Sequence, residues 1–264
     1  MPYTPEHTGT RIYYETSGEG PPLVFVHPPS MGHVTFRHQV DALKKHFFVI
    51  TLDLRGDGRS EAGEESLTMA LLAEDVCRVL DACAVKSAYV FGYSNGGSIV
   101  QELAIHYPER VRGLILSGGF ADVHTILLKN QFRIGILTAK LKATTFLSNV
   151  LSKAHEKEKK HRDELRAYIQ RTEPERLAEM YQIGLEYKAT ERLSYIKCPV
   201  LLIYGAKDDY VHEYQEAFKK RVPAPVEVVY VSRAKHQVPT RFSRELNAIV
   251  LSFCRRVEVG ELVH

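Results

Sequence analysis

Ser94 lies at the centre of a Gly-x-Ser-x-Gly sequence and is the side chain best placed to act as a nucleophile. The apolar run 88–91 before it predicts a strand, and the pattern from Asn95 to His106 predicts a helix. A serine on a tight strand-to-helix turn is lifted clear of the sheet, where its hydroxyl can reach a substrate. Gly92 and Gly96 have no Cβ that would crowd this strained turn.

A nucleophilic serine needs a base that takes its proton and a carboxylate that orients the base. Asp208 and Asp209 follow one predicted strand, and His236 follows the next. Working residues of doubly wound sheets lie in loops at the carboxyl ends of strands, so we expect these side chains to meet Ser94. The chain order of serine, acid and histidine is the one expected on such a sheet.

The elements that must position these residues alternate between strand and helix. Predicted strands cover residues 11–16, 23–27, 47–52, 88–91, 111–117, 200–204 and 226–231. Predicted helices cover about residues 69–83, 95–106, 213–220 and 241–255. The strands are near-continuous apolar runs, as expected for burial on both faces. We therefore predict an α/β fold with a doubly wound, mostly parallel sheet, helices on both faces and an antiparallel first strand.

One long stretch breaks the alternation. Residues 122–194 have helical patterns and no convincing strand, so we predict a helical cap inserted between two core strands. The core would then comprise residues 1–121 and 195–264. Within the cap, residues 152–166 interleave lysines with acidic residues, which predicts a solvated helix face.

The composition is that of an ordinary globular protein, with 44% apolar and 25% charged residues among 264. Lys and Arg number 35 against 32 Asp and Glu, a surplus too small to indicate a nucleic-acid or membrane-surface partner. No apolar stretch is long enough for a membrane span, and the N-terminus lacks signal-peptide features, so a cytoplasmic location is expected. Without metal-ligand spacings or a Gly-x-Gly-x-x-Gly sequence, we expect no metal and no cofactor. A monomer or homodimer is expected.

Several motifs, taken in this order, resemble the α/β-hydrolase-fold superfamily of serine hydrolases with a helical cap. The resemblance extends from about Tyr13 to Val257. It rests on His27-Pro28-Pro29, on the Asp-x-Arg-Gly-x-Gly-x-Ser stretch from Asp53 to Ser60, on the Ser94 turn, on Gly205-Ala206-Lys207-Asp208 and on His236.

The resemblance implies a role for each of these residues. Ser94 would be the nucleophile, His236 the base and Asp208 the acid, with Asp209 and Asp122 as alternatives for the acid. Gly92, Tyr93 and Gly96 would form the nucleophile elbow around the serine. His27 and the segment 53–60 would brace the site, and His33, His38 and His124 are weaker candidates for its lining.

Pro29 departs from the family pattern. The family has His-Gly-x here, and the backbone N–H of x helps to hold the oxyanion, but proline has no N–H. The other expected donor, the amide of Asn95, is intact. We expect the amide of Ser30 to replace the missing donor, because the Pro-Pro pair would rigidly reposition it. Met31, a side chain, or a chemistry that depends less on the oxyanion hole are the alternatives.

The function predicted from these residues is hydrolysis through an acyl-enzyme. The bond would be ester-like (carboxylic ester, thioester or lactone) or an activated C–C bond, in a small molecule with an apolar acyl or aromatic part. Perhydrolases and acyltransferases can use the same triad. A non-catalytic ligand-binding protein on the same fold is the alternative from another class, although it would not need Asp208 and His236 together.

Overall fold

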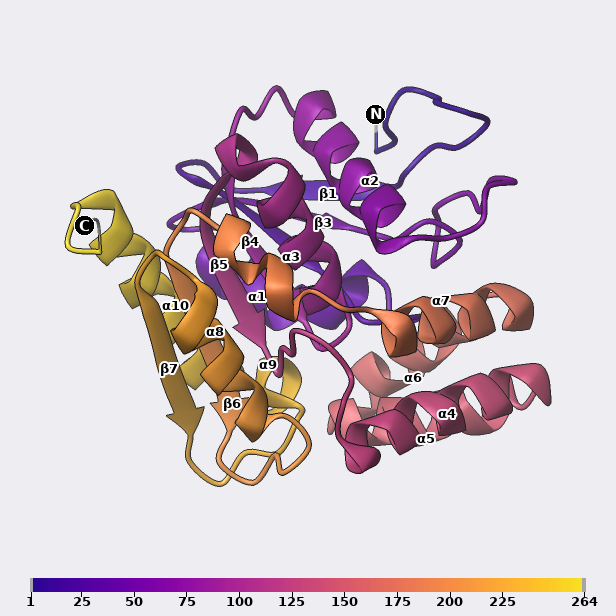
Figure 1. Cartoon of the computed structure of the whole chain (residues 1–264). Coiled ribbons are helices and arrows are strands. Elements are labelled where there is room, and N and C mark those ends of the chain that lie inside the picture. The colour runs from indigo at the N-terminus through magenta and orange to yellow at the C-terminus, as the bar shows by residue number, and fades with distance from the viewer. Residues whose placement is uncertain (1, 263–264) are drawn as a thin grey trace.

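The computed structural model of the chain describes residues 2–262 and is built around a seven-stranded sheet (Figure 1). The strands are β1 Tyr14–Ser17, β2 Pro22–Val26, β3 Phe48–Leu52, β4 Ala88–Tyr93, β5 Val111–Ser117, β6 Val200–Gly205 and β7 Val226–Val231. Their order across the sheet is β1-β3-β2-β4-β5-β6-β7, with β1 antiparallel and the other pairs parallel. The predicted strands and the predicted fold class are confirmed.

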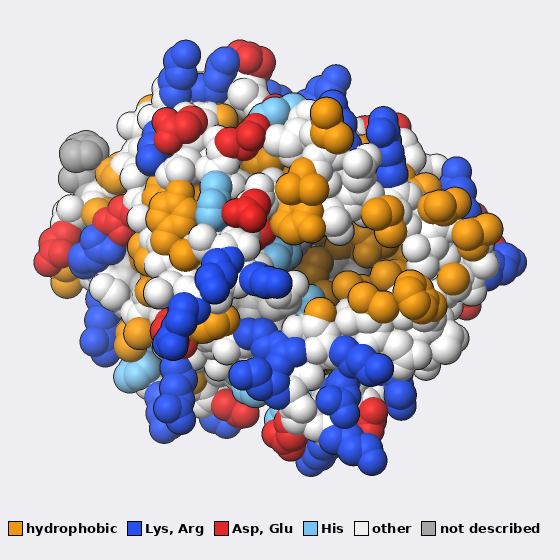
Figure 2. All heavy atoms as spheres, turned by 90° about the horizontal axis from the view of Figure 1, so that it is seen from below, with side chains coloured by type: hydrophobic (Ala, Val, Ile, Leu, Met, Phe, Trp, Pro, Cys, Tyr) orange, Lys and Arg blue, Asp and Glu red, His pale blue; other side chains and the backbone are white. Residues whose placement is uncertain are grey.

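The strand order brings two distant loops together. Strands β2 and β4 are neighbours, with Val26 opposite Gly92, although β3 lies between them in the sequence. The loop after β2 therefore meets the turn after β4 at the carboxyl edge of the sheet, the position where doubly wound folds bind ligands. Figure 2 views the molecule from this edge, where its surface is hollowed.

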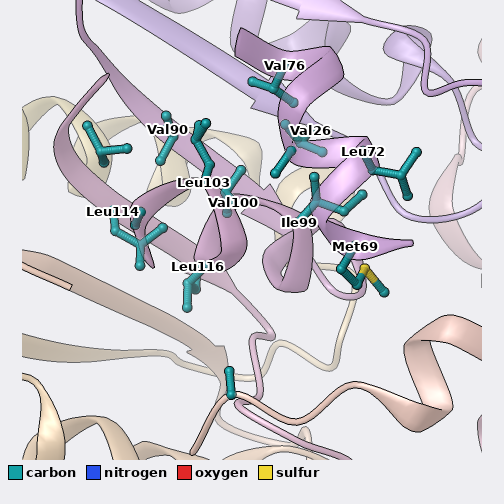
Figure 3. Close-up of a cluster of buried hydrophobic side chains, with 14 of the residues drawn as sticks. Val26, Met69, Leu72, Val76, Val90, Ile99, Val100, Leu103, Leu114 and Leu116 are labelled. Atoms are coloured by element: carbon teal, nitrogen blue, oxygen red, sulfur yellow. The ribbon is translucent and has the colours of Figure 1, made fainter. Parts of the chain in front are cut away.

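Helices cover both faces of the sheet. Helices α1 Arg37–Leu43 and α10 Ser243–Glu258 pack on one face, and α2 Met69–Ala82, α3 Gly96–His106 and α8 Gln215–Arg221 pack on the other. Val24 and Val26 belong to the second layer, whereas Leu23 and Phe25 belong to the first. Figure 3 shows side chains of α2 and α3 converging with those of the strands. This two-sided burial explains why the strands read as continuous apolar runs. The short α1 and α9 Val238–Arg241 were not predicted.

Four helices lie between β5 and β6: α4 Ile126–Lys140, α5 Thr144–His155, α6 Lys159–Ile169 and α7 Pro174–Glu186. We call α4 to α7 the inserted helices; they lie together at one side of the sheet (Figure 1). The segment 152–166 is not one solvated helix face, because α5 ends at His155 and both His155 and Glu156 are buried.

A buried ion pair ties α2 to the loop after β3. The guanidinium of Arg55 donates two hydrogen bonds of 2.8 Å to the carboxylate of Asp75, and both side chains are 1% exposed. Charges this deeply buried are stable only while they remain paired, because each would otherwise lose its hydration without compensation.

We expect Asp75→Ala to lower the free energy of unfolding by about 3–5 kcal/mol, because it removes the buried partner of the Arg55 guanidinium and leaves it a 3.2 Å contact with the partly exposed Glu65 as its remaining ion pair. Urea denaturation followed by circular dichroism measures this. Asp81→Ala is the matched control on α2, since Asp81 is 65% exposed and pairs with Arg110 at the surface. Its expected cost is less than about 1 kcal/mol. Equal losses for the two variants would contradict the prediction.

Candidate active site

Ser94 is held on a strained turn at the end of β4. Its φ is +52°, in the left-handed region, and α3 begins two residues later. A Cβ on Gly92 would lie 2.5 Å from the Cα of Gly97, and one on Gly96 would lie 2.4 Å from the carbonyl oxygen of Val26. The backbones approach so closely that only glycine fits at these two positions.

The structure brings Ser94, His236 and Asp208 together. The Nε2 atom of His236 lies 2.9 Å from the Oγ of Ser94, and its Nδ1 lies 2.6 Å from Oδ2 of Asp208. Asp208 is 1% exposed, whereas Asp209 is exposed to solvent. Asp122 pairs instead with His124, whose Nδ1 lies 2.5 Å from Oδ1 of Asp122. Among the candidate carboxylates, Asp208 is the one that contacts His236.

A cavity of about 290 Å³ opens beside Ser94. Its lining comes from the loop after β2 (Pro28, Pro29, Met31), from the inserted helices (Leu128, Gln131, Phe132, Leu151, His155, Tyr181) and from Tyr93, Ser94, Asn95, Tyr210, His236 and Gln237. His33, His38 and His124 are not part of this lining. No residue of the inserted helices was predicted from the sequence to line the cavity. The only signal for them was the i, i+4 spacing of Leu128 and Phe132, which marks the inner face of α4.

Two titratable side chains of the inserted helices face the cavity in their neutral forms. Burial lowers the pKa of His155 to about 3, and its Nδ1 lies 3.3 Å from Oγ1 of Thr240. Burial raises the pKa of Tyr181 to about 12, so its hydroxyl keeps its proton. That hydroxyl makes no hydrogen bond to any residue in the described part of the chain. Both groups can therefore contact a substrate without adding a charge to the site.

The amides near the oxyanion position are mostly engaged. Pro29 lines the cavity but has no N–H. Ser30 has a φ of +65°, and its N–H donates to Oδ2 of Asp57 at 2.9 Å. The amide of Ser30 already has a buried acceptor, so the structure does not support the expectation that Ser30 supplies the missing donor, which stays a prediction. Met31 donates to a carbonyl of its own loop at 3.3 Å. Within residues 2–262, the N–H of Asn95 has no acceptor.

The segment 53–60 braces these loops through the carboxylate of Asp53. That carboxylate accepts hydrogen bonds from the N–H and Nδ1 of His33 and from the N–H of Arg59, at 2.7–2.8 Å. His27 is fully buried, and its Nε2 accepts from the N–H of Leu54 at 2.9 Å. Burial lowers the pKa of His27 to about 4, which keeps it neutral. The geometry matches a structural role for both Asp53 and His27.

One group of potential metal ligands lies outside the cavity lining. His38, Glu156 and His161 have ligand atoms within 4.8 Å of one another, contributed by α1 and by the junction of α5 and α6. No other group of three such residues occurs in the described part of the chain. The expectation that the reaction needs no metal stays a prediction.

Residues 21–238 match the family model described as alpha/beta hydrolase fold. The chain belongs to this family. The hydrolase is 28% identical to the putative carbamate hydrolase RutD of Azorhizobium caulinodans, over 98% of this chain and 100% of that protein. It is also 28% identical to the pimeloyl-[acyl-carrier protein] methyl ester esterase of Nitrosospira multiformis, over 92% and 98% of the two chains. An enol-lactonase from Burkholderia xenovorans has the same fold, with a TM-score of 0.85, 22% identity and coverage of 96% and 100%.

Asp57 links the loop after β2 to the inserted helices of this hydrolase. It accepts from Ser30 and, at 2.5 Å, from the hydroxyl of Thr172. Burial raises the pKa of Asp57 to about 7, whereas the carboxyl titrates near pH 4 in an unfolded chain. Folding therefore favours the protonated form, and the stability gained from it is lost as the pH rises from about 4 to about 7.

Relative to Asp57→Asn, we expect the free energy of unfolding of the parent to fall by up to about 4 kcal/mol between pH 4 and pH 7. Above about pH 7 the difference should stay constant. Urea denaturation of both proteins at several pH values measures this difference. Titration of His27 changes the stability of both proteins in the same way, so it cancels in the comparison. Parallel pH profiles of the two proteins would contradict the raised pKa of Asp57.

Proposed function

We propose that this hydrolase cleaves ester-like carbonyl compounds through an acyl-enzyme on Ser94. The observation that carries the proposal is a pair of hydrogen bonds at the wall of a cavity. One joins Ser94 to His236, and the other joins His236 to the buried Asp208. The names of the full-length relatives, an esterase and a putative carbamate hydrolase, support attack on an acyl carbon. The apolar residues Leu128 and Phe132 favour a substrate with an apolar acyl or aromatic part.

The reaction would follow from the positions of three side chains. His236 takes the proton of Ser94 through Nε2 as Oγ attacks the carbonyl carbon, and Asp208 stabilises the imidazolium through Nδ1. His236 then returns the proton to the leaving group as the C–O bond breaks. It next activates a water molecule, which hydrolyses the acyl-enzyme and regenerates Ser94. The inserted helices would act as a cap that limits access of bulk water to these steps.

The oxyanion would be held by the N–H of Asn95 and by the hydroxyl of Tyr181. Asn95 stands at the N-terminus of α3, where the helix dipole favours negative charge. Its side-chain amide lies 3.4 Å from the carbonyl of Met180, the residue before Tyr181 on α7. Tyr181 lines the same cavity as Ser94 and Pro29 and is a neutral donor there.

We expect Asp208→Asn to lower kcat by about a thousand- to ten-thousandfold, because His236 loses the carboxylate that orients it. Asp209→Asn is the matched control and should stay close to the parent. Hydrolysis of p-nitrophenyl esters of increasing acyl length measures kcat, and a p-nitrophenyl carbamate and a lactone extend the panel. Labelling by a fluorophosphonate probe should occur in the parent and be lost in Ser94→Ala.

A well-folded parent that neither reacts with the probe nor hydrolyses any member of the panel would refute the proposal. Such a protein would be better explained as a ligand-binding member of the same fold.

We expect Tyr181→Phe to lower kcat by about a hundredfold with little change in KM, because a donor to the oxyanion acts mainly in the transition state. Tyr210→Phe is the control, since Tyr210 also lines the cavity but accepts a hydrogen bond from Gln131. Equal effects of the two substitutions, or a change in KM alone, would assign Tyr181 to substrate binding instead.

A further inference from the structure

Exposed apolar side chains are concentrated on α4, α5 and the turn between them. Ten large hydrophobic residues are exposed in the described part of the chain, and seven of them belong to this hairpin: Ile126, Leu127, Ile134, Leu137, Leu141, Phe146 and Val150. Figure 2 shows hydrophobic side chains gathered beside the hollow in this face of the molecule. Such a contiguous group usually marks an interaction site.

Packing of the inserted helices does not account for these residues. The buried side of α4 consists of Leu128, Phe132, Gly135 and Ala139. Ile134, Leu137 and Leu141 lie at spacings of three and four residues on its opposite, outer side, and Leu141 is 69% exposed. Helix α4 is therefore apolar on two sides, and only one of them is covered by the fold.

The same hairpin carries a strong positive charge. Residues 126–155 contain five basic side chains and no Asp or Glu: Lys129, Arg133, Lys140, Lys142 and Lys153. The remainder of the chain has 30 Lys and Arg against 32 Asp and Glu, so its net charge is slightly negative. The small surplus of the whole chain argued against a membrane surface, but that average conceals this segregation of charge.

The charge decides which partner suits this surface. A symmetric contact between two copies of the chain would bring the same patch on each copy together and oppose cation to cation, since only Lys142 of the five pairs with an acidic residue (Glu175) in the described part of the chain. An anionic lipid surface offers phosphates to the cations and an apolar boundary to leucine, isoleucine and phenylalanine. None of the described helices has the length and hydropathy to cross a bilayer, so the hairpin would lie in the plane of the interface.

We propose that the outer surface of α4 and α5 binds an anionic lipid surface. The inner sides of the same helices contribute Leu128, Phe132, Leu151 and His155 to the cavity beside Ser94. Docking therefore brings the cavity next to the lipid boundary, where amphiphilic molecules are concentrated. Binding itself does not depend on the proposed hydrolysis, since Ser94 is not part of the outer surface.

Flotation with vesicles tests the proposal on the full chain in a Ser94→Ala background, so that lipid cleavage cannot affect the result. The probes are vesicles of phosphatidylcholine alone and vesicles in which about a third of the lipid is phosphatidylglycerol. We expect at least tenfold tighter binding to the anionic vesicles, weakened by salt. Arg133→Gln with Lys140→Gln should weaken binding about thirtyfold, because each cation near the surface contributes about a fivefold gain in affinity.

Leu137→Glu with Leu141→Glu should abolish flotation, because it replaces two apolar side chains of the outer surface with charges that anionic lipids repel. Tyr195→Glu with Val259→Glu is the matched control, because it introduces the same charges at exposed apolar residues outside the hairpin. Circular dichroism checks that each variant is folded. Equal flotation with both kinds of vesicle, or equal loss in the control, would overturn the proposal. A dimer in sedimentation velocity that Leu137→Glu converts to monomer would also overturn it, in favour of a second copy as the partner.

Discussion

The close contact between the start of α3 and the sheet is the constraint on which the site depends. Gly92 and Gly96 let the helix backbone approach β4 and β2 at distances that no side chain permits. This approach holds Ser94 at a φ of +52°, a conformation that costs of order 1–3 kcal/mol for a residue other than glycine. Burial of α2 and α3 against the strands offsets that cost (Figure 3). The reactive geometry is thus maintained by the core beneath it.

The loop after β2 lines the cavity but has few free N–H groups to offer a ligand. Pro28 and Pro29 bring no N–H, and the amide of Ser30 satisfies the buried carboxyl of Asp57. That carboxyl also accepts from Thr172, so the loop and the inserted helices are fixed to each other. In the proposed reaction, donors for the developing negative charge would come from the N-terminus of α3 and from side chains in the cavity. The proposed donors therefore lie on α3 and α7 and not on the loop that contains Pro29.

Helix α4 has two apolar sides, and each has its own surroundings. Its inner side, with Leu128 and Phe132, narrows the cavity beside Ser94. Its outer side, with Leu137 and Leu141, faces solvent among cations. A helix that only covered the site would need the first side alone. The second side is why we propose that the inserted helices bind a lipid surface in addition to lining the cavity.

The sequence by itself determined the sheet and the elbow, because burial on two faces produces continuous apolar runs and a strained turn requires glycines at fixed spacing. Only the tertiary structure showed that Asp208 rather than Asp209 contacts His236, since a shift of one residue in a loop reverses which carboxylate points inward. It alone showed that Ser30 is engaged, because its acceptor lies 27 residues away. His155 and Tyr181 had no local signal, since helix packing rather than spacing carries them to the cavity.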